Sequence, residues 1–281
     1  MIRSLLYVPG SSPKFIAKAH ERGADAVIVD LEDAVAPSEK TPAREALTDS
    51  VRSVGRGGAT TFVRVNNSDE RLLPDAAAAC RAGADGLYIP KVTTPDLLAA
   101  IARHIAPIEV KLGRKPMVFV PLIEDPGSVF DARPIAGHER VLALSAGAED
   151  LATAMGALPT PEVLKLPKQL IHMAAKAAGV LSFGLLRTVA DYSDVESMRM
   201  AAREARDFGF DGASCIHPSV VAILNEAFAP SEAEIAWARR VIAANAEAAA
   251  AGTGAFTLDG RFVDAPIVTR AEAVIALSER L

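Results

Sequence analysis

Two carboxylates that follow apolar runs are the residues of this 281-residue chain best suited to chemistry. Glu124 ends the run "MVFVPLIE" (117–124), and Asp150 follows the run "VLALSAG" (141–147) within the letters "GAED". Acids are poor strand formers and costly to bury, so carboxylates at the ends of buried strands need a compensating partner. Oxygen ligands of this kind suit Mg²⁺ or Mn²⁺, which proteins usually hold through one or two carboxylates and water. We predict that Glu124 and Asp150 share one such ion.

Arg64 is the cation that could act together with this metal. It lies in "TFVRVN" (61–66), on the same face of the predicted strand as Phe62. A guanidinium can hold a carboxylate through two parallel hydrogen bonds. An arginine opposite a metal is suited to binding a 2-oxo acid and stabilising an enolate, which cleavage or formation of a C–C bond beside a carbonyl requires. The same arginine could instead be a structural ion-pair partner of Asp30 or Glu32.

Eight short apolar runs, interpreted as strands, would position these side chains. They cover 4–9, 26–32, 61–66, 86–91, 117–124, 141–147, 181–188 and 212–217, with helix-forming segments at 40–53, 74–83, 94–104, 164–178 and 194–207. Three of the joints repeat one pattern, in which a glycine suited to the left-handed end of a helix precedes an acid and a buried strand. Eight βα units in about 220 residues predict a TIM (β/α)8 barrel. A doubly wound open sheet is the alternative, but no G-x-G-x-x-G turn follows the first strand.

Polar residues at the carboxyl ends of barrel strands face the active site. Alternation along the strands predicts which side chains face inward. The inward rows are Ile28, Asp30 and Glu32 on the second strand, Leu87, Ile89 and Lys91 on the fourth, and Ala213, Cys215 and His217 on the eighth. We expect Lys91 either at the rim of the site or in a salt bridge. For His217 we expect a buried, hydrogen-bonded side chain rather than a catalytic base.

The C-terminal residues fall outside the barrel pattern. A capping box from Ser231 to Glu234 opens a long helix, and the Asp259–Gly260 pair predicts a hairpin turn before a last helix. We therefore expect a barrel domain over residues 1–228 and a helical and hairpin extension over 229–281. The extension would act as a lid or as an arm that packs on a neighbouring subunit.

The composition excludes several classes of partner. The formal net charge is −5 and there is no run of Lys and Arg, which argues against a nucleic-acid-binding protein. No apolar stretch reaches transmembrane length, so we expect no association with a membrane. The two cysteines, Cys80 and Cys215, have no pairing or metal spacing, which favours a reduced, cytoplasmic protein.

Several motifs in order along the chain resemble those of the HpcH/HpaI aldolase and citrate lyase beta-subunit-like family. They are "LLYVPG", "ADAVIVDLEDAV", "FVRVN", "PLIEDP", "SAGAEDLA", "IHPSVV" and "RFVDAP". The resemblance covers essentially the whole chain. It implies a TIM barrel with C-terminal helices that pack across subunits, in trimers or hexamers. It also implies Mg²⁺-dependent aldol or Claisen cleavage, often of CoA esters such as malyl-, citramalyl- or citryl-CoA.

The resemblance also implies roles for individual residues. It implies that Glu124 and Asp150 are metal ligands, and that Arg64 binds the carboxylate or carbonyl of the oxo acid. The backbone of Ala148, Glu149 and Asp150 would assist Arg64, and Asp264 in "FVDAP" resembles the acid that an adjacent subunit supplies for proton transfer.

Further residues are expected around this set. Lys14, in the first turn of a helix capped at Ser12, could bind a phosphate of CoA. Glu32 and Asp33 would orient Arg64 or a water on the metal, and Lys91 would lie beside them.

We therefore expect an enzyme, a Mg²⁺-dependent C–C lyase that acts on a 3-hydroxy acid or its CoA thioester and releases or uses a 2-oxo acid. Two alternatives stay open. The same site could hydrolyse the ester, which would make the protein an acyl-CoA thioesterase. The chain could also be non-catalytic, or a beta-like subunit that works only within an acyl-carrier lyase complex.

Overall fold

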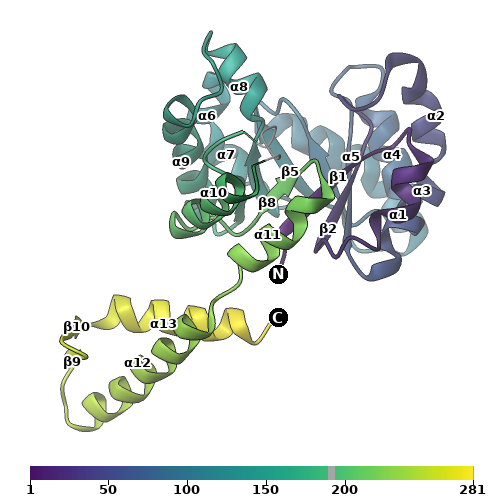
Figure 1. The fold of residues 1–281 in the computed structure, drawn as a ribbon. Helices are drawn as coiled ribbons and strands as arrows, with labels where there is room; N and C mark the ends of the chain where they lie inside the picture. The colour runs from purple at the N-terminus through teal and green to yellow at the C-terminus, as the bar shows by residue number, and fades with distance from the viewer. Residues whose placement is uncertain (189–193, 281) are drawn as a thin grey trace. The chain divides into compact units, whose positions relative to one another are not determined.

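Eight parallel strands form one sheet in the part of the chain before residue 226 (Figure 1). The computed structural model describes residues 1–188 and 194–280. The strands are β1 (Ser4–Pro9), β2 (Ala26–Asp30), β3 (Thr60–Arg64), β4 (Gly86–Ile89), β5 (Val118–Ile123), β6 (Ala143–Ala146), β7 (Leu181–Phe183) and β8 (Ala213–Cys215). Their order in the sheet is β7-β6-β5-β4-β3-β2-β1-β8, and a parallel bridge between Phe183 and Gly212 joins the two ends. The predicted TIM barrel is confirmed.

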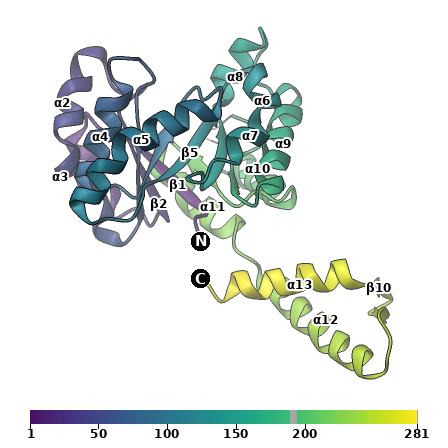
Figure 2. The same ribbon diagram turned by 180° about the vertical axis from the view of Figure 1, so that it is seen from behind.

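Helices cover the outside of this barrel, because both faces of a parallel sheet must be buried. They are α1 (Pro13–Ala19), α2 (Lys40–Glu45), α3 (Leu47–Val54), α4 (Leu72–Ala82), α5 (Pro95–Leu112), α6 (Pro126–Phe130), α7 (Ala132–Ala136), α8 (Ala148–Ala154), α9 (Pro161–Ala177), α10 (Val195–Asp207) and α11 (Val221–Ala227). Figure 2 shows α4 and α5 side by side on the outside of the sheet. The single helix predicted over 40–53 is two helices, which meet at Ala46.

Glycines end the helical segments where the sequence predicted them. Gly23, Gly83 and Gly209 have φ values of 70°, 85° and 94°, in the left-handed region that only glycine adopts without strain. Each precedes a strand by a few residues, so the repeated joint is confirmed.

Side chains from the inner faces of the strands fill the barrel. Leu5, Ile28, Phe62, Tyr88, Val120, Leu122, Ala143 and Phe183 are among the buried residues of this cluster. The prediction for the fourth strand was wrong, because Tyr88 rather than Leu87 or Ile89 belongs to the cluster. Lys91 does not continue the inward row, because its φ of 54° breaks the alternation of an extended strand.

The inward row predicted for the eighth strand was also wrong. Ser214 and Ile216 line the central cavity, so Ala213 and Cys215 face the surrounding helices. Both faces of a parallel strand are apolar, and the residue types alone therefore did not distinguish them. His217 is exposed, and its Nδ1 accepts a hydrogen bond from the Ser219 backbone N–H over 3.2 Å. It is hydrogen-bonded, as expected, but it is not buried.

The chain divides into two compact units, Ile2–Asn225 and Glu226–Leu281 together with Met1. The second unit contains α12 (Glu232–Ala250), the antiparallel pair β9 (Phe256–Leu258) and β10 (Arg261–Val263), and α13 (Ala265–Ser278). Its capping box is formed, with the Ser231 N–H donating to Glu234 Oε2 over 2.7 Å. Asp259 and Gly260 have φ values of 52° and 74°, so the predicted hairpin turn is confirmed. Ala238, Val241, Val263, Val268 and Ala271 form the core of this unit.

Among the described helices, none combines the length and the apolar composition that crossing a bilayer requires.

Candidate active site

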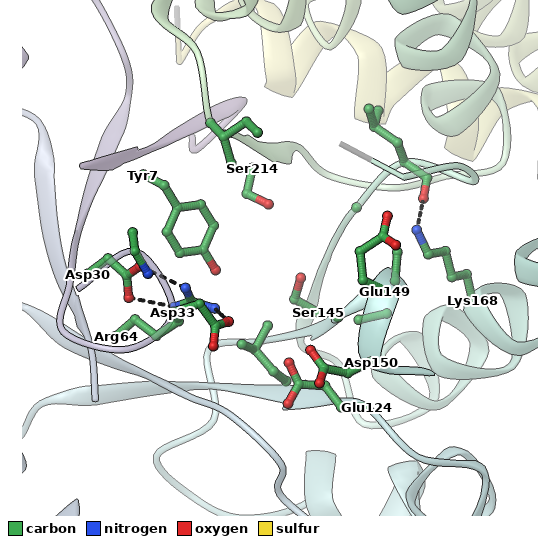
Figure 3. A pocket seen from close by; sticks show the side chains of 18 of the residues that line it. Tyr7, Asp30, Asp33, Arg64, Glu124, Ser145, Glu149, Asp150, Lys168 and Ser214 are labelled. Atoms are coloured by element: carbon green, nitrogen blue, oxygen red, sulfur yellow. Dashed lines mark hydrogen bonds and ion pairs between the residues drawn. The ribbon is translucent and has the colours of Figure 1, made fainter. Parts of the chain in front are cut away.

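A cavity of about 500 Å³ opens at the carboxyl ends of the barrel strands (Figure 3). Its lining residues are Tyr7, Pro9, Asp30, Asp33, Ala34, Arg64, Leu122, Glu124, Ser145, Ala146, Gly147, Ala148, Glu149, Asp150, Lys168, Gly184, Leu185, Ser214 and Ile216. They come from segments far apart in the sequence, which the parallel barrel brings to one end. The cavity therefore contains Arg64, Glu124 and Asp150 together.

Arg64 is held at the end of β3 by Asp30, the residue paired with it across β2 and β3. Arg64 Nε and Nη2 each donate a hydrogen bond of 2.7 Å to a different oxygen of Asp30. The backbone N–H groups of Glu32 and Ala34 donate to the same two oxygens. Burial alone would lower the pKa of Arg64, but the hydrogen bonds to Asp30 and the attraction of the surrounding acidic groups, Tyr7, Asp30 and Glu32, together outweigh it and raise the pKa. Arg64 is therefore a fixed, permanent cation.

The third guanidinium nitrogen faces two further acids. Arg64 Nη1 donates to Asp33 Oδ2 over 3.1 Å. It also lies 3.0 Å from Glu32 Oε2, but out of line for a hydrogen bond, so that buried oxygen has no hydrogen-bond partner. Burial raises the pKa of Glu32 to about 7. The predicted places of Glu32 and Asp33 beside Arg64 agree with this arrangement.

Glu124 and Asp150 lie next to each other on the opposite side of the cavity from Arg64 (Figure 3). Glu124 follows β5, is 5 % exposed, and accepts a 2.8 Å hydrogen bond at Oε2 from the Lys91 backbone N–H. Burial raises its pKa to about 8, and repulsion by Glu32 and Asp150 adds to the effect. Asp150 lies in the first turn of α8, where a carboxylate is favoured by the helix dipole.

The structure corrects one detail of this segment. β6 ends at Ala146, and Asp150 belongs to a helix that starts at Ala148 rather than to the end of the strand. Gly147 lies between them, and a Cβ there would lie 2.3 Å from Glu124 Oε1. The absence of a side chain at Gly147 therefore leaves room for the Glu124 carboxylate beside the start of α8.

The donor set fits a hard cation such as Mg²⁺. No group of three His, Cys, Asp or Glu side chains in residues 1–188 and 194–280 could hold a metal. Two carboxylates are nevertheless sufficient for Mg²⁺, which keeps waters and takes substrate oxygens. The negative charges of Glu32 and Asp150 repel that of Glu124 and add to the rise of its pKa. A cation bound between these carboxylates would neutralise this repulsion. The assignment of Glu124 and Asp150 as the ligands stays a prediction.

Lys91 joins the two carboxylates through its backbone and its side chain. Its N–H binds Glu124, and its Nζ lies 3.9 Å from Asp150 Oδ1. Its φ of 54° is unusual for a residue with a side chain and costs free energy, which is typical of functional sites. Lys91 therefore lies at the rim of the site and in a weak salt bridge at once.

The remaining predicted residues lie in three places. Ala148 and Glu149 line the cavity, and the Thr188 hydroxyl donates to Glu149. Lys14 is exposed on α1 and is not among the lining residues. Asp264 lies in the second unit, at the position before α13, and makes no side-chain hydrogen bond to the start of that helix.

Sequence reasoning missed Tyr7 and Lys168. Tyr7 could have been found, because it alternates with the inward-facing Leu5 on β1. Lys168 could not, because a lysine in a helical segment is normally at the surface. It is 4 % exposed, and its Nζ donates hydrogen bonds of 2.8 Å to the carbonyls of Leu185 and Arg187. Burial lowers the pKa of Lys168 to about 7, although the Glu149 carboxylate opposes the shift.

Known proteins resemble this chain along its whole length. A model of the HpcH/HpaI aldolase/citrate lyase family matches residues 3–218. A (3S)-malyl-CoA thioesterase of Cereibacter sphaeroides is 35% identical over 287 residues, which cover 99% of this chain and 95% of the relative. The citrate lyase subunit beta of Leuconostoc mesenteroides subsp. cremoris is 33% identical over 282 residues, covering 98% and 93%. The crystal structure of CitE from Mycobacterium tuberculosis with magnesium, acetoacetate and coenzyme A has a TM-score of 0.81 and 30% identity, covering 98% and 97%.

Proposed function

Because the chain belongs to the HpcH/HpaI aldolase/citrate lyase family, we propose that it is a Mg²⁺-dependent carbon–carbon lyase. Its substrate is a 3-hydroxy acid, in the form of its CoA thioester, and one product is a 2-oxo acid. One observation carries the proposal: a fixed cation, Arg64, and two adjacent carboxylates, Glu124 and Asp150, face each other across one cavity.

Arg64 binds the carboxylate of the 2-oxo acid half of the substrate. Asp30 occupies Nε and Nη2, so the guanidinium keeps its orientation when the acid is absent. A preoriented cation loses little conformational entropy on binding an anion. Glu124 and Asp150 would hold Mg²⁺, which would supply Lewis-acid polarisation of the substrate oxygens.

Cleavage then follows the chemistry of a retro-Claisen reaction. The hydroxyl at C3 gives its proton to solvent water, the C2–C3 bond breaks, and C3 becomes the carbonyl carbon of the 2-oxo acid. The electron pair of the broken bond forms the enolate of the acyl group, and C2 then takes a proton. Asp264 donates that proton from the extension of a neighbouring subunit in a homotrimer or homohexamer.

The names of the relatives support a CoA thioester as the substrate. The Cereibacter sphaeroides relative is named for malyl-CoA, and the tuberculosis CitE structure contains coenzyme A. The first name also favours a second candidate function, hydrolysis of the thioester. The Leuconostoc relative is a subunit, which favours a chain that works only inside a complex.

Product analysis separates these functions. The purified full chain is incubated with Mg²⁺ and malyl-, citramalyl- or citryl-CoA, and the 2-oxo acid, the acyl-CoA and free CoA are quantified. A lyase releases acyl-CoA and 2-oxo acid in equal amounts, whereas a thioesterase releases free CoA without a 2-oxo acid. No turnover of any ester would favour the obligate subunit. We expect Asp150→Ala to abolish turnover while the protein stays folded, and full activity in that variant would contradict the proposal.

A further inference from the structure

Tyr7 presents its hydroxyl to the cavity on the side of Arg64. It lies on β1, lines the cavity, and points into it from beside the guanidinium (Figure 3). Tyr7 belongs neither to the proposed ligand set nor to the acids around Arg64. Its side chain is partly exposed.

The Tyr7 hydroxyl has no hydrogen-bond partner in the part of the chain that the structure describes, whereas its ring is held on two sides. The Arg64 guanidinium carbon lies 5.0 Å from the ring centroid, in a cation–π contact. The Tyr88 ring packs edge-on with its centroid 6.0 Å away. The hydroxyl is therefore fixed in place by the packing of its ring and not by a bond of its own.

Burial also determines what the hydroxyl can do. It raises the pKa of Tyr7 above its ordinary value, although Arg64 opposes the shift. The phenol therefore stays protonated at neutral pH and can donate a hydrogen bond. A fixed neutral donor beside a fixed cation is suited to an anionic, oxygen-rich ligand, because both groups then bind without reorganising.

We infer that Tyr7 is a specificity-determining residue whose hydroxyl donates a hydrogen bond to an oxygen of the 2-oxo acid bound by Arg64. The inference rests on the proposed function, since it needs a 2-oxo acid at Arg64. The Tyr7 ring contacts Arg64, which in the proposed function binds the 2-oxo acid. The Tyr7 hydroxyl therefore lies beside the 2-oxo acid half of the substrate rather than beside the CoA half. A phenylalanine would pack equally well and lack the donor.

Tyr88 offers a matched control. Its hydroxyl is also without a hydrogen-bond partner, but the residue is fully buried in the barrel and is not among the lining residues. The rings of Tyr7 and Tyr88 pack against each other, and each substitution by Phe removes one hydroxyl that has no hydrogen-bond partner among the described residues. Only Tyr7→Phe removes a hydroxyl that faces the cavity. Isothermal calorimetry measures the affinity of the wild type and of both variants for glyoxylate, pyruvate and oxaloacetate at saturating MgCl₂. A separate titration with MgCl₂ alone measures the Mg²⁺ affinity of each protein, and thermal unfolding gives its melting temperature.

We expect Tyr7→Phe to weaken binding of the acid that the wild type prefers by about ten- to a hundredfold, as for loss of a hydrogen bond to a charged acceptor. Mg²⁺ affinity and the melting temperature should not change, and Tyr88→Phe should bind the acid like the wild type. Equal binding by Tyr7→Phe and the wild type would overturn the inference and leave the proposed function standing. Equal losses in both variants would also overturn it, because packing would then be the cause. If the wild type binds no 2-oxo acid with Mg²⁺, both proposals fail.

Discussion

Arg64 illustrates how the residue types predicted the site. The sequence left open whether it binds substrate or pairs with Asp30 or Glu32, and the structure shows that pairing does not remove it from the cavity. The ion pair instead orients the guanidinium toward the cavity. Glu124 and Asp150 could be selected from the sequence because they follow apolar runs, and Arg64 because it shares the inward face of a predicted strand. Lys168 could not, because nothing in a helical pattern distinguishes a lysine that points inward from one at the surface.

Lys168 makes the stability of the protein depend on pH in a defined direction. The native state releases its proton near pH 7, whereas the unfolded chain releases it near 10.5. Between these values the unfolded chain binds more protons, so the free energy of unfolding contributed by this residue rises with pH. We expect Lys168→Met to reduce that rise. Urea unfolding at pH 7, 8 and 9 measures it, with the exposed Lys111→Met as a control. Identical pH slopes in all three proteins would contradict the buried position of Lys168.

At the scale of the elements, the sequence predicted every strand and overestimated the length of most. β2, β4 and β7 end two to five residues before the apolar runs do, because the loops that follow are also packed into the barrel end. The joint between β6 and α8 was the least predictable. The predicted run ends at residue 147 and β6 ends at Ala146, but the helix that starts at Ala148, and with it the place of Asp150 in a first helical turn, was not predicted.

Gly147 is the residue of this joint on which the proposed metal site depends. In Gly147→Ala the new Cβ would collide with Glu124 Oε1, so we expect the carboxylate to be displaced and Mg²⁺ binding to be lost. Gly137→Ala is the control, because its Cβ would have no neighbour closer than 3.5 Å. Thermal unfolding with and without MgCl₂ measures the effect. Mg²⁺ should raise the melting temperature of the wild type and of Gly137→Ala only. An undiminished Mg²⁺ effect in Gly147→Ala would contradict the dependence of Mg²⁺ binding on Gly147.

At the scale of the whole molecule, eight apolar runs at regular intervals were sufficient to predict a barrel. The hairpin and the long helix of the second unit followed from local signals, Ser231 with Glu234 and the Asp259–Gly260 turn. The sequence of one chain contains no comparable signal for the partner on which an extension packs. The supply of Asp264 by a neighbouring subunit therefore stays part of the proposal.

Mixed oligomers test this part of the proposal. Asp150→Ala removes a group from the cavity of one chain, and Asp264→Ala removes the acid from the extension. If Asp264 acts across subunits, co-expression of the two inactive variants should restore turnover, because some cavities then combine an intact Asp150 with an intact Asp264. Each variant purified alone is the control. No recovery in an oligomer shown to contain both chains would mean that Asp264 acts within its own chain or not at all.

The most direct test of the central claim is calorimetric titration of the wild-type chain with glyoxylate, pyruvate and oxaloacetate, with saturating Mg²⁺ and again with a chelator. The arrangement of Arg64 opposite Glu124 and Asp150 predicts that at least one of these acids binds with Mg²⁺ and that none binds without it. Acetyl-CoA should then bind more tightly to the complex than to the free protein. Failure of all three acids to bind with Mg²⁺, or equal binding in the chelator, would contradict the metal-dependent 2-oxo acid site.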